Sequence, residues 1–387
     1  MKGPSAATLY GTEAANGVLL FRTKRGRPGP ARWNIGIEQG MISDANTYPD
    51  NYTSFRAAIP AGTRATCLLR DLAAGACTQD SVTTFNALEN AATTSIASGY
   101  RSRYNLNVGG GSDAVTYFVS GLYQTDNGTL KLNQGEQDRL IASRGVEELP
   151  DEVIRPNNLQ KTGLRANLTA RVANRGEILV SAAYVSSVTR FPQNDNNVLG
   201  YLPSGYFGRG SVSDTSALNA NGVPNGGYGF FRAGEIFSLL RKQNVERFTG
   251  GVIGNFAPAP WLTTKAVVGY DITNRTDISF DPTNLGPNFS SVIIGNKIDN
   301  RAAIKAYTVD VGASGLAQLS RDIRSRTSVG GQYFKDVFFL NQAQGQGLTF
   351  GSADIDGAAI LTASQTTTDV RTMGVYVEQR SEEHTSE

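Results

Sequence analysis

The sequence is poor in the side chains that most catalytic and metal sites use. It contains one histidine, His384, and two cysteines among 387 residues. Nucleophile triads and histidine-ligated zinc sites need an imidazole, and the single histidine lies close to the end of the chain. We therefore expect no catalytic residue, no metal site and no cofactor, and a protein that is not an enzyme.

Long apolar runs and an excess of one charge are also lacking. Hydrophobic residues make up 40% of the chain, charged residues 18%, and the formal net charge is +2. No stretch approaches the ~18 consecutive apolar residues that a membrane helix needs. A nearly neutral chain gives no argument for nucleic-acid binding, which normally shows a strong basic excess. The composition thus excludes a helical membrane protein and predicts no nucleic-acid partner.

What the chain does contain is repeated alternation of apolar and polar residues. Trp33, Ile35 and Ile37 would share one face of a strand, with Asn34 and Glu38 on the other. The same period of two recurs along the chain. It predicts ten strands, at 33–38, 104–108, 115–123, 164–172, 178–186, 248–256, 262–272, 307–319, 327–333 and 370–379.

The lengths of the connections separate a membrane barrel from a soluble β-sandwich. Four connections are short, at 109–113, 173–177, 257–261 and 320–322. Five are long and show no periodic pattern, at roughly 42–102, 125–161, 188–240, 282–302 and 335–368. Outer-membrane barrels alternate short periplasmic turns with longer extracellular loops. The sequence therefore predicts an all-β fold, a transmembrane antiparallel β-barrel of which about ten strands are present.

The start of the chain carries a motif of a different kind. Ser5 can cap a short helix of small residues, and a strand at 17–23 then leads into a basic segment. The motif consists of Tyr10, Gly11, Ala14, Ala15, Asn16, Gly17, Thr23, Lys24, Arg25 and Gly26. In residue types and order it resembles the end of the plug domain of TonB-dependent outer-membrane receptors. AANGV followed by TKRG is most similar to the SusC/RagA branch, and 109–123 and 260–271 resemble hairpins of SusC-like barrels.

The resemblance implies a domain organisation. Residues 1–28 would be the C-terminal remnant of an α/β plug domain, and 29–379 the N-terminal part of a barrel that has about 22 strands in that family. The last eight residues, 380–387, match the translation of a sequencing-adapter string. We therefore expect the chain to be a truncated fragment with a foreign tail.

The resemblance also implies a function, a location and partners. Members of the family are located in the cell outer membrane and import a nutrient, usually an oligosaccharide or a peptide. The expected partners are the TonB complex, through a missing N-terminal part, a SusD-like lipoprotein and outer-membrane lipid. Two alternatives stay open: a siderophore or cobalamin receptor of the same fold, and a secreted β-rich adhesin or carbohydrate-binding protein.

Cys67 and Cys77 are a candidate disulfide. Both lie in the first long connection, ten residues apart. The predicted topology places this connection outside the cell, where oxidising conditions favour pairing.

Overall fold

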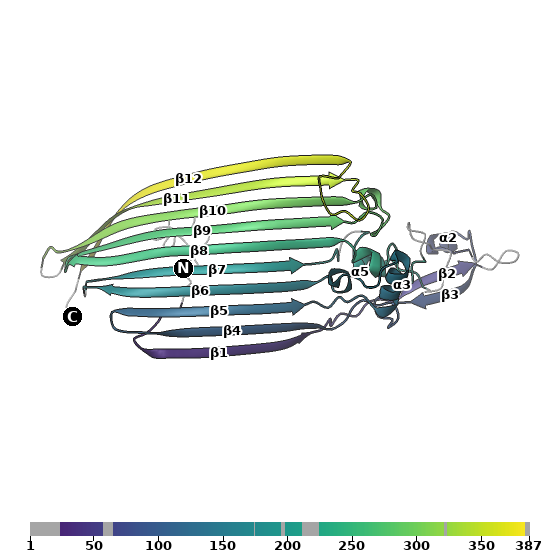
Figure 1. Ribbon diagram of the computed structural model, residues 1–387, viewed down its shortest axis with the longest axis horizontal. Coiled ribbons are helices and arrows are strands. Elements are labelled where there is room, and N and C mark those ends of the chain that lie inside the picture. The colour runs from purple at the N-terminus through teal and green to yellow at the C-terminus, as the bar shows by residue number, and fades with distance from the viewer. Residues whose placement is uncertain are drawn as a thin grey trace.

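A computed structural model describes residues 24–56, 65–173, 175–194, 198–210, 224–320 and 323–383. Its main element is a ten-stranded antiparallel sheet with the strand order β1-β4-β5-β6-β7-β8-β9-β10-β11-β12 (Figure 1). The strands are β1 (Gly29–Ile42), β4 (Gly99–Gly111), β5 (Val115–Asn127), β6 (Asn158–Val172), β7 (Gly176–Arg190), β8 (Leu240–Ala259), β9 (Leu262–Asp281), β10 (Asn296–Gln318), β11 (Ile323–Gln346) and β12 (Ile360–Glu383).

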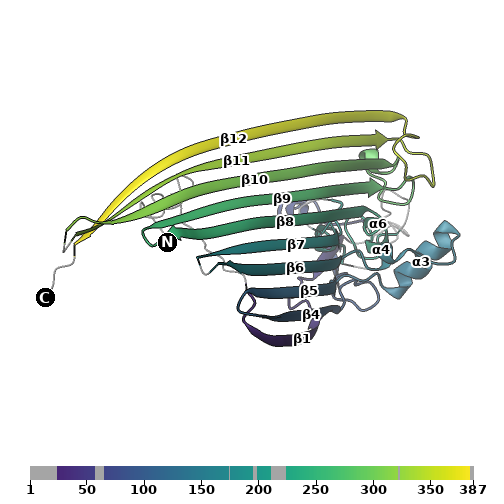
Figure 2. The ribbon, with the colours of Figure 1, turned by 60° about the vertical axis from the view of Figure 1, so that its left-hand side comes forward.

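The sheet confirms the predicted fold class and all ten predicted strands. Each strand pairs with its neighbour in the chain, except that β1 pairs with β4 across the first long connection. The sheet is curved, and its strands lengthen from β1 towards β12 (Figure 2). A curved antiparallel sheet with strands in sequence order is the arrangement of a barrel wall. No helix in the described part of the chain is both long enough and apolar enough to cross a membrane.

The predicted strand ends were wrong for the longest strands. The segment 335–368 was expected to be a connection, but β11 continues to Gln346 and β12 begins at Ile360. Likewise β10 begins at Asn296, inside the expected connection 282–302. The backbone pairing continues without interruption over these parts, as in Asn341↔Gln365. Alternation ends earlier in β11 because Val337, Phe338, Phe339 and Leu340 place apolar side chains on both faces and mostly polar residues follow them. A strand without a difference between its faces shows no period of two.

The long connections were expected to lack regular structure, and this was also wrong. They contain the two-stranded sheet of β2 (Asn51–Arg56) and β3 (Gln79–Phe85), and several short helices. The helices are α2 (Leu69–Ala73), α3 (Gln134–Arg144), α4 (Asp151–Ile154), α5 (Tyr201–Tyr206), α6 (Ala233–Ile236) and the 3-10 helix η2 (Ser290–Val292). We call the described parts of the connections β1–β4, β5–β6, β7–β8 and β9–β10 the loop cap. The loop cap lies at one end of the sheet (Figure 1).

The loop cap has a hydrophobic core of its own. Leu132, Tyr201, Tyr228 and Phe237 come from two different connections and are at most 1% exposed. Tyr201 packs on Phe237 with ring centroids 5.4 Å apart, and its hydroxyl accepts a hydrogen bond from the backbone N–H of Ser95 at 2.8 Å. Tyr48 and Val292 join the same core from the first and last of the four connections. The four connections therefore fold as one packed unit.

Buried charges also hold the loop cap together. The carboxylate of Glu136, in α3, is 3% exposed and pairs with Arg139 at 2.8 Å and with Arg232. Arg144, at the end of α3, donates to the backbone oxygen of Leu285 at 2.9 Å, which belongs to the β9–β10 connection. Burial lowers the pKa of the Arg144 guanidinium. Because a buried charge without a partner is strongly destabilising, these pairs fix how the connections dock on one another.

Local signals explain why α3 forms where it does. The side chain of Asn133 accepts a hydrogen bond from the backbone N–H of Glu136 at 2.9 Å, which caps the first turn. Gly145 ends the helix with a φ of 65°, a conformation that glycine adopts at little cost. The cap and the stop place Leu140 on the loop-cap core and Arg144 beside the next connection.

Cys67 and Cys77 form a disulfide in the structure. It closes the segment that carries α2, between β2 and β3. The backbone N–H of Cys67 also donates to the oxygen of Ser54 at 2.8 Å, which ties this segment to β2.

Removing the side chain of Leu132 should loosen the loop cap without disturbing the sheet. Leu132 is fully buried, and Leu→Ala at such a site costs about 2–5 kcal/mol. Limited proteolysis of the protein should then cut the loop cap of Leu132→Ala faster than that of the wild type. Val146→Ala is the control, because Val146 is 42% exposed. Equal cleavage rates for Leu132→Ala and the wild type would show that this core does not hold the cap.

Candidate functional site

Residues 1–23 lie outside the described residues, so most of the plug-like motif has no structural counterpart here. Its last three residues, Lys24, Arg25 and Gly26, lie against the sheet. The backbone oxygen of Lys24 accepts from Asn167 Nδ2 in β6 at 2.7 Å, and Arg25 pairs with Glu177 in β7 at 3.2 Å. At Gly26 a Cβ atom would come within 2.3 Å of the backbone oxygen of Tyr117 in β5. Only glycine permits this close approach.

The face of the sheet that carries Asn167 is lined with charged and amide side chains, and we call it the polar face. Ion pairs cross between its strands, such as Arg101–Asp126 at 2.7 Å. Arg247 and Asp271 pair at 2.6 Å between β8 and β9. The segment 24–26 lies on this face, because it bonds Asn167. A barrel that is filled by a plug has this kind of polar interior.

The opposite face, which we call the apolar face, exposes large hydrophobic side chains. The register places Leu164 beside Tyr184, Tyr184 beside Phe248, and Phe248 beside Ile272. Exposed members of this face include Trp33, Ile35, Ile37, Leu106, Val115, Val119, Leu168, Val172, Ile178, Val180, Val252, Phe256, Val268, Val309, Val311, Met373, Val375 and Val377. A continuous apolar surface of this extent on a soluble protein would drive association, whereas lipid favours it.

The height of the apolar band fits a bilayer. On this face the band runs from Leu164 to Val172 in β6 and from Phe248 to Phe256 in β8, nine residues in each strand. Between these bounds no Asp, Glu, Lys or Arg lies on the apolar face of either strand. A strand tilted in a membrane needs about 9–11 residues to cross the hydrocarbon core. The band therefore has the length of a membrane crossing, although the strands themselves are longer.

Tyrosines mark the end of the band that is nearer the loop cap. Three of them direct their hydroxyl groups to a polar side chain of the same face. Tyr104 accepts from Gln39 at 3.2 Å, and Tyr123 accepts from Gln160 at 3.1 Å. Tyr184 bonds Glu246 at 3.1 Å. Tyrosine at a membrane surface keeps its ring in the apolar layer and its hydroxyl in the polar one.

From β4 to β11 the tyrosines lie progressively nearer the tight-turn end of the sheet, as they would if the strands were tilted in the membrane. Tyr104 and Tyr123 are direct partners, and their row of paired residues reaches β11 at Phe339. The tyrosine of β11 on the same face is Tyr333, six residues nearer the turn. Six residues are about 20 Å, and the strand spacings from β4 to β11 sum to about 34 Å. The ratio corresponds to a tilt of about 30°, close to the ~35–45° of membrane barrels.

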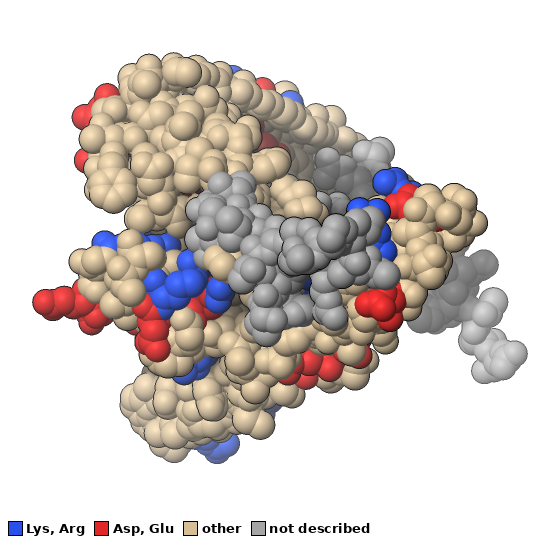
Figure 3. Space-filling view, turned by 90° about the vertical axis from the view of Figure 1, so that its right-hand side faces the viewer, with Lys and Arg blue, Asp and Glu red and all other residues tan. Residues whose placement is uncertain are grey.

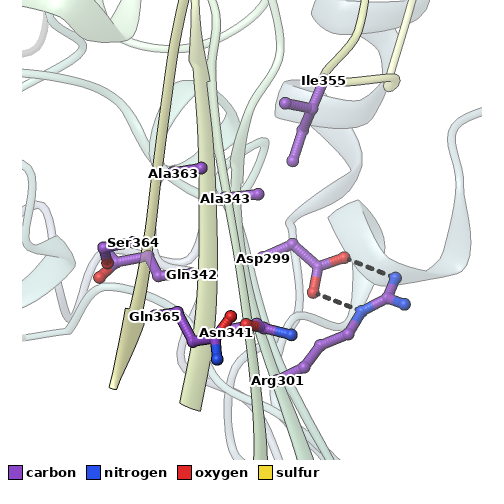
Figure 4. Close-up of a pocket in the computed structure, with 9 residues that line it drawn as sticks. All are labelled: Asp299, Arg301, Asn341, Gln342, Ala343, Ile355, Ala363, Ser364 and Gln365. Carbon is purple, nitrogen blue, oxygen red and sulfur yellow. Dashed lines mark hydrogen bonds and ion pairs between the residues drawn. The ribbon is translucent and has the colours of Figure 1, made fainter. Parts of the chain in front are cut away.

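One polar hollow lies on the apolar face beyond the band, where β10, β11 and β12 approach the β11–β12 connection (Figure 4). Asp299 and Arg301 form a two-bond ion pair there, with both distances 3.1 Å. Asn341 and Gln365 are the neighbouring amides. Among the described residues, no group of three or more His, Cys, Asp and Glu side chains could hold a metal ion.

The loop cap presents a mixed polar surface at its end. Viewed from this end, Lys, Arg, Asp and Glu atoms lie mainly across the middle height of the described surface, while its upper and lower parts are mostly uncharged (Figure 3).

Of the comparisons with known proteins, the one with solved structures bears on the fold. No protein-family model and no curated protein matches the chain. Among solved structures, the RagAB peptide importer in its open-open state matches with a TM-score of 0.67 and 14% identity over 98% of this chain. Its closed-closed state gives 0.64 and 14% over 97%. The chain spans 43% of the length of the matched chain in both. At this identity the likeness is one of fold.

The ferric-catecholate import receptor Fiu of E. coli K12 is much less similar to the chain. The match covers 93% of this chain and 52% of that one, with 11% identity and a TM-score of 0.33.

The candidate functional site is the wall of ten strands, because its two faces differ in chemistry.

A lysine on the apolar face should be far more costly than one on the polar face. Val252 faces outward in the middle of the band and Ile253, its neighbour in β8, faces the other way. A lysine near the bilayer midplane costs ~2–4 kcal/mol. We expect Val252→Lys to lower the amount of heat-modifiable protein in the outer membrane, and Ile253→Lys to lower it much less. Equal loss for both variants would contradict the assignment of the faces.

The two ends of the sheet should lie on opposite sides of the membrane. An epitope inserted after Glu147, an exposed residue of the loop cap, should bind antibody on intact cells. The same epitope at Asp113, in the tight turn between β4 and β5, should bind only after the cells are opened. The reverse labelling would invert the topology.

Proposed function

We propose that this chain forms part of the wall of a TonB-dependent outer-membrane importer of the SusC/RagA type, which takes up a peptide or an oligosaccharide. The observation that carries the proposal is the sheet with an apolar band of membrane height on one face and ion-paired polar side chains on the other. A secreted adhesin has no need of such a band. The shared fold with a peptide importer supports the same class.

In this proposal residues 1–28 are the end of a plug that fills the barrel, and 29–379 belong to the wall. The contacts of Lys24, Arg25 and Gly26 with three adjacent strands support it, because they fasten the start of the described chain to the polar face. Energy from TonB would move the more distant part of the plug, while this end stays bonded to β5, β6 and β7. The barrel wall would therefore keep its conformation while movement of the plug opens a path through the barrel.

The loop cap would form the outer binding surface of the importer. Its core fixes four connections in one arrangement, so ligand-binding side chains can be held at defined distances. A SusD-like lipoprotein is the proposed partner above it. We favour the SusC/RagA type over a siderophore or cobalamin receptor because the plug-like motif contains the sequences AANGV and TKRG.

Uptake by cells that carry the full-length gene tests the proposal. Cells given labelled oligopeptides or labelled oligosaccharides should accumulate one of the two classes, and a proton uncoupler or loss of TonB should abolish the accumulation. The class that enters identifies the ligand. Binding at the cell surface with no energy-dependent uptake would favour the adhesin instead.

A further inference from the structure

The register isolates a group of cations at the membrane surface of one part of the wall. Lys305 in β10, Lys335 in β11 and Arg371 in β12 all belong to the apolar face, as Tyr307, Tyr333 and Met373 do. Each cation lies two residues nearer the loop-cap end than the Tyr or Met of its own strand, which is about 7 Å along the strand. The headgroup layer extends from the edge of the hydrocarbon core to roughly 5–7 Å beyond it, so the cations lie at its level.

The corresponding positions of other strands carry no cation. Two residues beyond Tyr104, Tyr123 and Tyr184 on the same face are Ser102, Thr125 and Ser186, and Glu246 lies beyond Phe248. At this level of the apolar face the positive charge is therefore restricted to β10, β11 and β12, whereas the cations Arg190 and Lys242 of this face lie further towards the loop cap.

The cations are only partly neutralised within the chain. Lys335 and Arg371 are direct register partners, and like charges in this position repel each other. Asp369 bridges them, at 3.4 Å from Lys335 Nζ and 3.1 Å from Arg371 Nε. One carboxylate among three cations leaves two positive charges on this surface. Arg371 has 63% of its side chain exposed and can reach a further anion.

We propose that Lys305, Lys335 and Arg371 bind the phosphate groups of a lipid of the outer leaflet. The inference rests on the proposed membrane location of the wall. Phosphate suits this site because arginine and lysine both donate several hydrogen bonds to it. The neighbouring Tyr307 and Val309 offer the apolar surface that acyl chains need. The bound lipid would seal β10–β12 against the membrane at the level where the wall turns polar.

Binding of fluorescent lipid A to the purified full-length protein in a neutral detergent tests this site. The triple variant Lys305→Gln, Lys335→Gln, Arg371→Gln should bind lipid A at least tenfold more weakly, since each cation near an anionic lipid contributes roughly a fivefold effect. The control triple variant Lys161→Gln, Arg165→Gln, Lys265→Gln removes equal charge from the polar face and should bind as the wild type does.

Two further arms identify the ligand. Dephosphorylated lipid A should bind the wild type as weakly as lipid A binds the triple variant, and 10 mM inorganic phosphate, roughly the level of a common buffer, should not displace lipid A. Displacement by phosphate, or equal lipid A binding by the wild type and the triple variant, would overturn the lipid site. Heat-modifiable mobility is measured for the wild type and for each variant, as a check that the barrel has folded. A wild-type protein without heat-modifiable mobility would contradict the proposed membrane wall and not the lipid site.

Discussion

The antiparallel hydrogen bonding that links all ten strands of the main sheet is the constraint on which the rest of the structure depends. In hydrocarbon there is no water to bond a free backbone N–H or C=O group, so a strand can cross only if its neighbours satisfy both edges. Pairing at this density fixes the register. The register in turn decides which side chains face lipid and which face the polar side, since a slip of one residue would exchange the two sets.

The period of two was sufficient to predict the ten strands of the sheet. It succeeded where both faces had distinct chemistry, as from Leu164 to Val172. It failed beyond the tyrosines, where Asn341 and Gln365 keep the pairing but lose the apolar partner row. Hydrophobic alternation shows where one face of a strand is apolar and the other polar. Here the strands continue beyond the apolar band, so the alternation ends before the strands do.

The loop-cap core and the tyrosine positions could not be predicted from the sequence. Leu132, Tyr201 and Phe237 are isolated apolar residues in segments without a period, and only folding brings them together. The tilt that the tyrosines follow is a property of pairing between strands. In contrast, Cys67 and Cys77 could be singled out from spacing alone, because so few cysteines are present. Most of the plug-like motif falls outside the described residues, so its role stays a proposal.

The shared core of the loop cap has a consequence for how this surface can change over time. When loops are independent, each can be lengthened or exchanged freely, and recognition of new ligands can evolve one loop at a time. Here the buried Glu136 in one connection pairs with Arg232 in the next, and Arg144 bonds Leu285 in a third. A sequence change in one connection therefore alters the fitness of changes in the others. Variation among relatives of this chain should appear as correlated sets of loops, inherited together as a module.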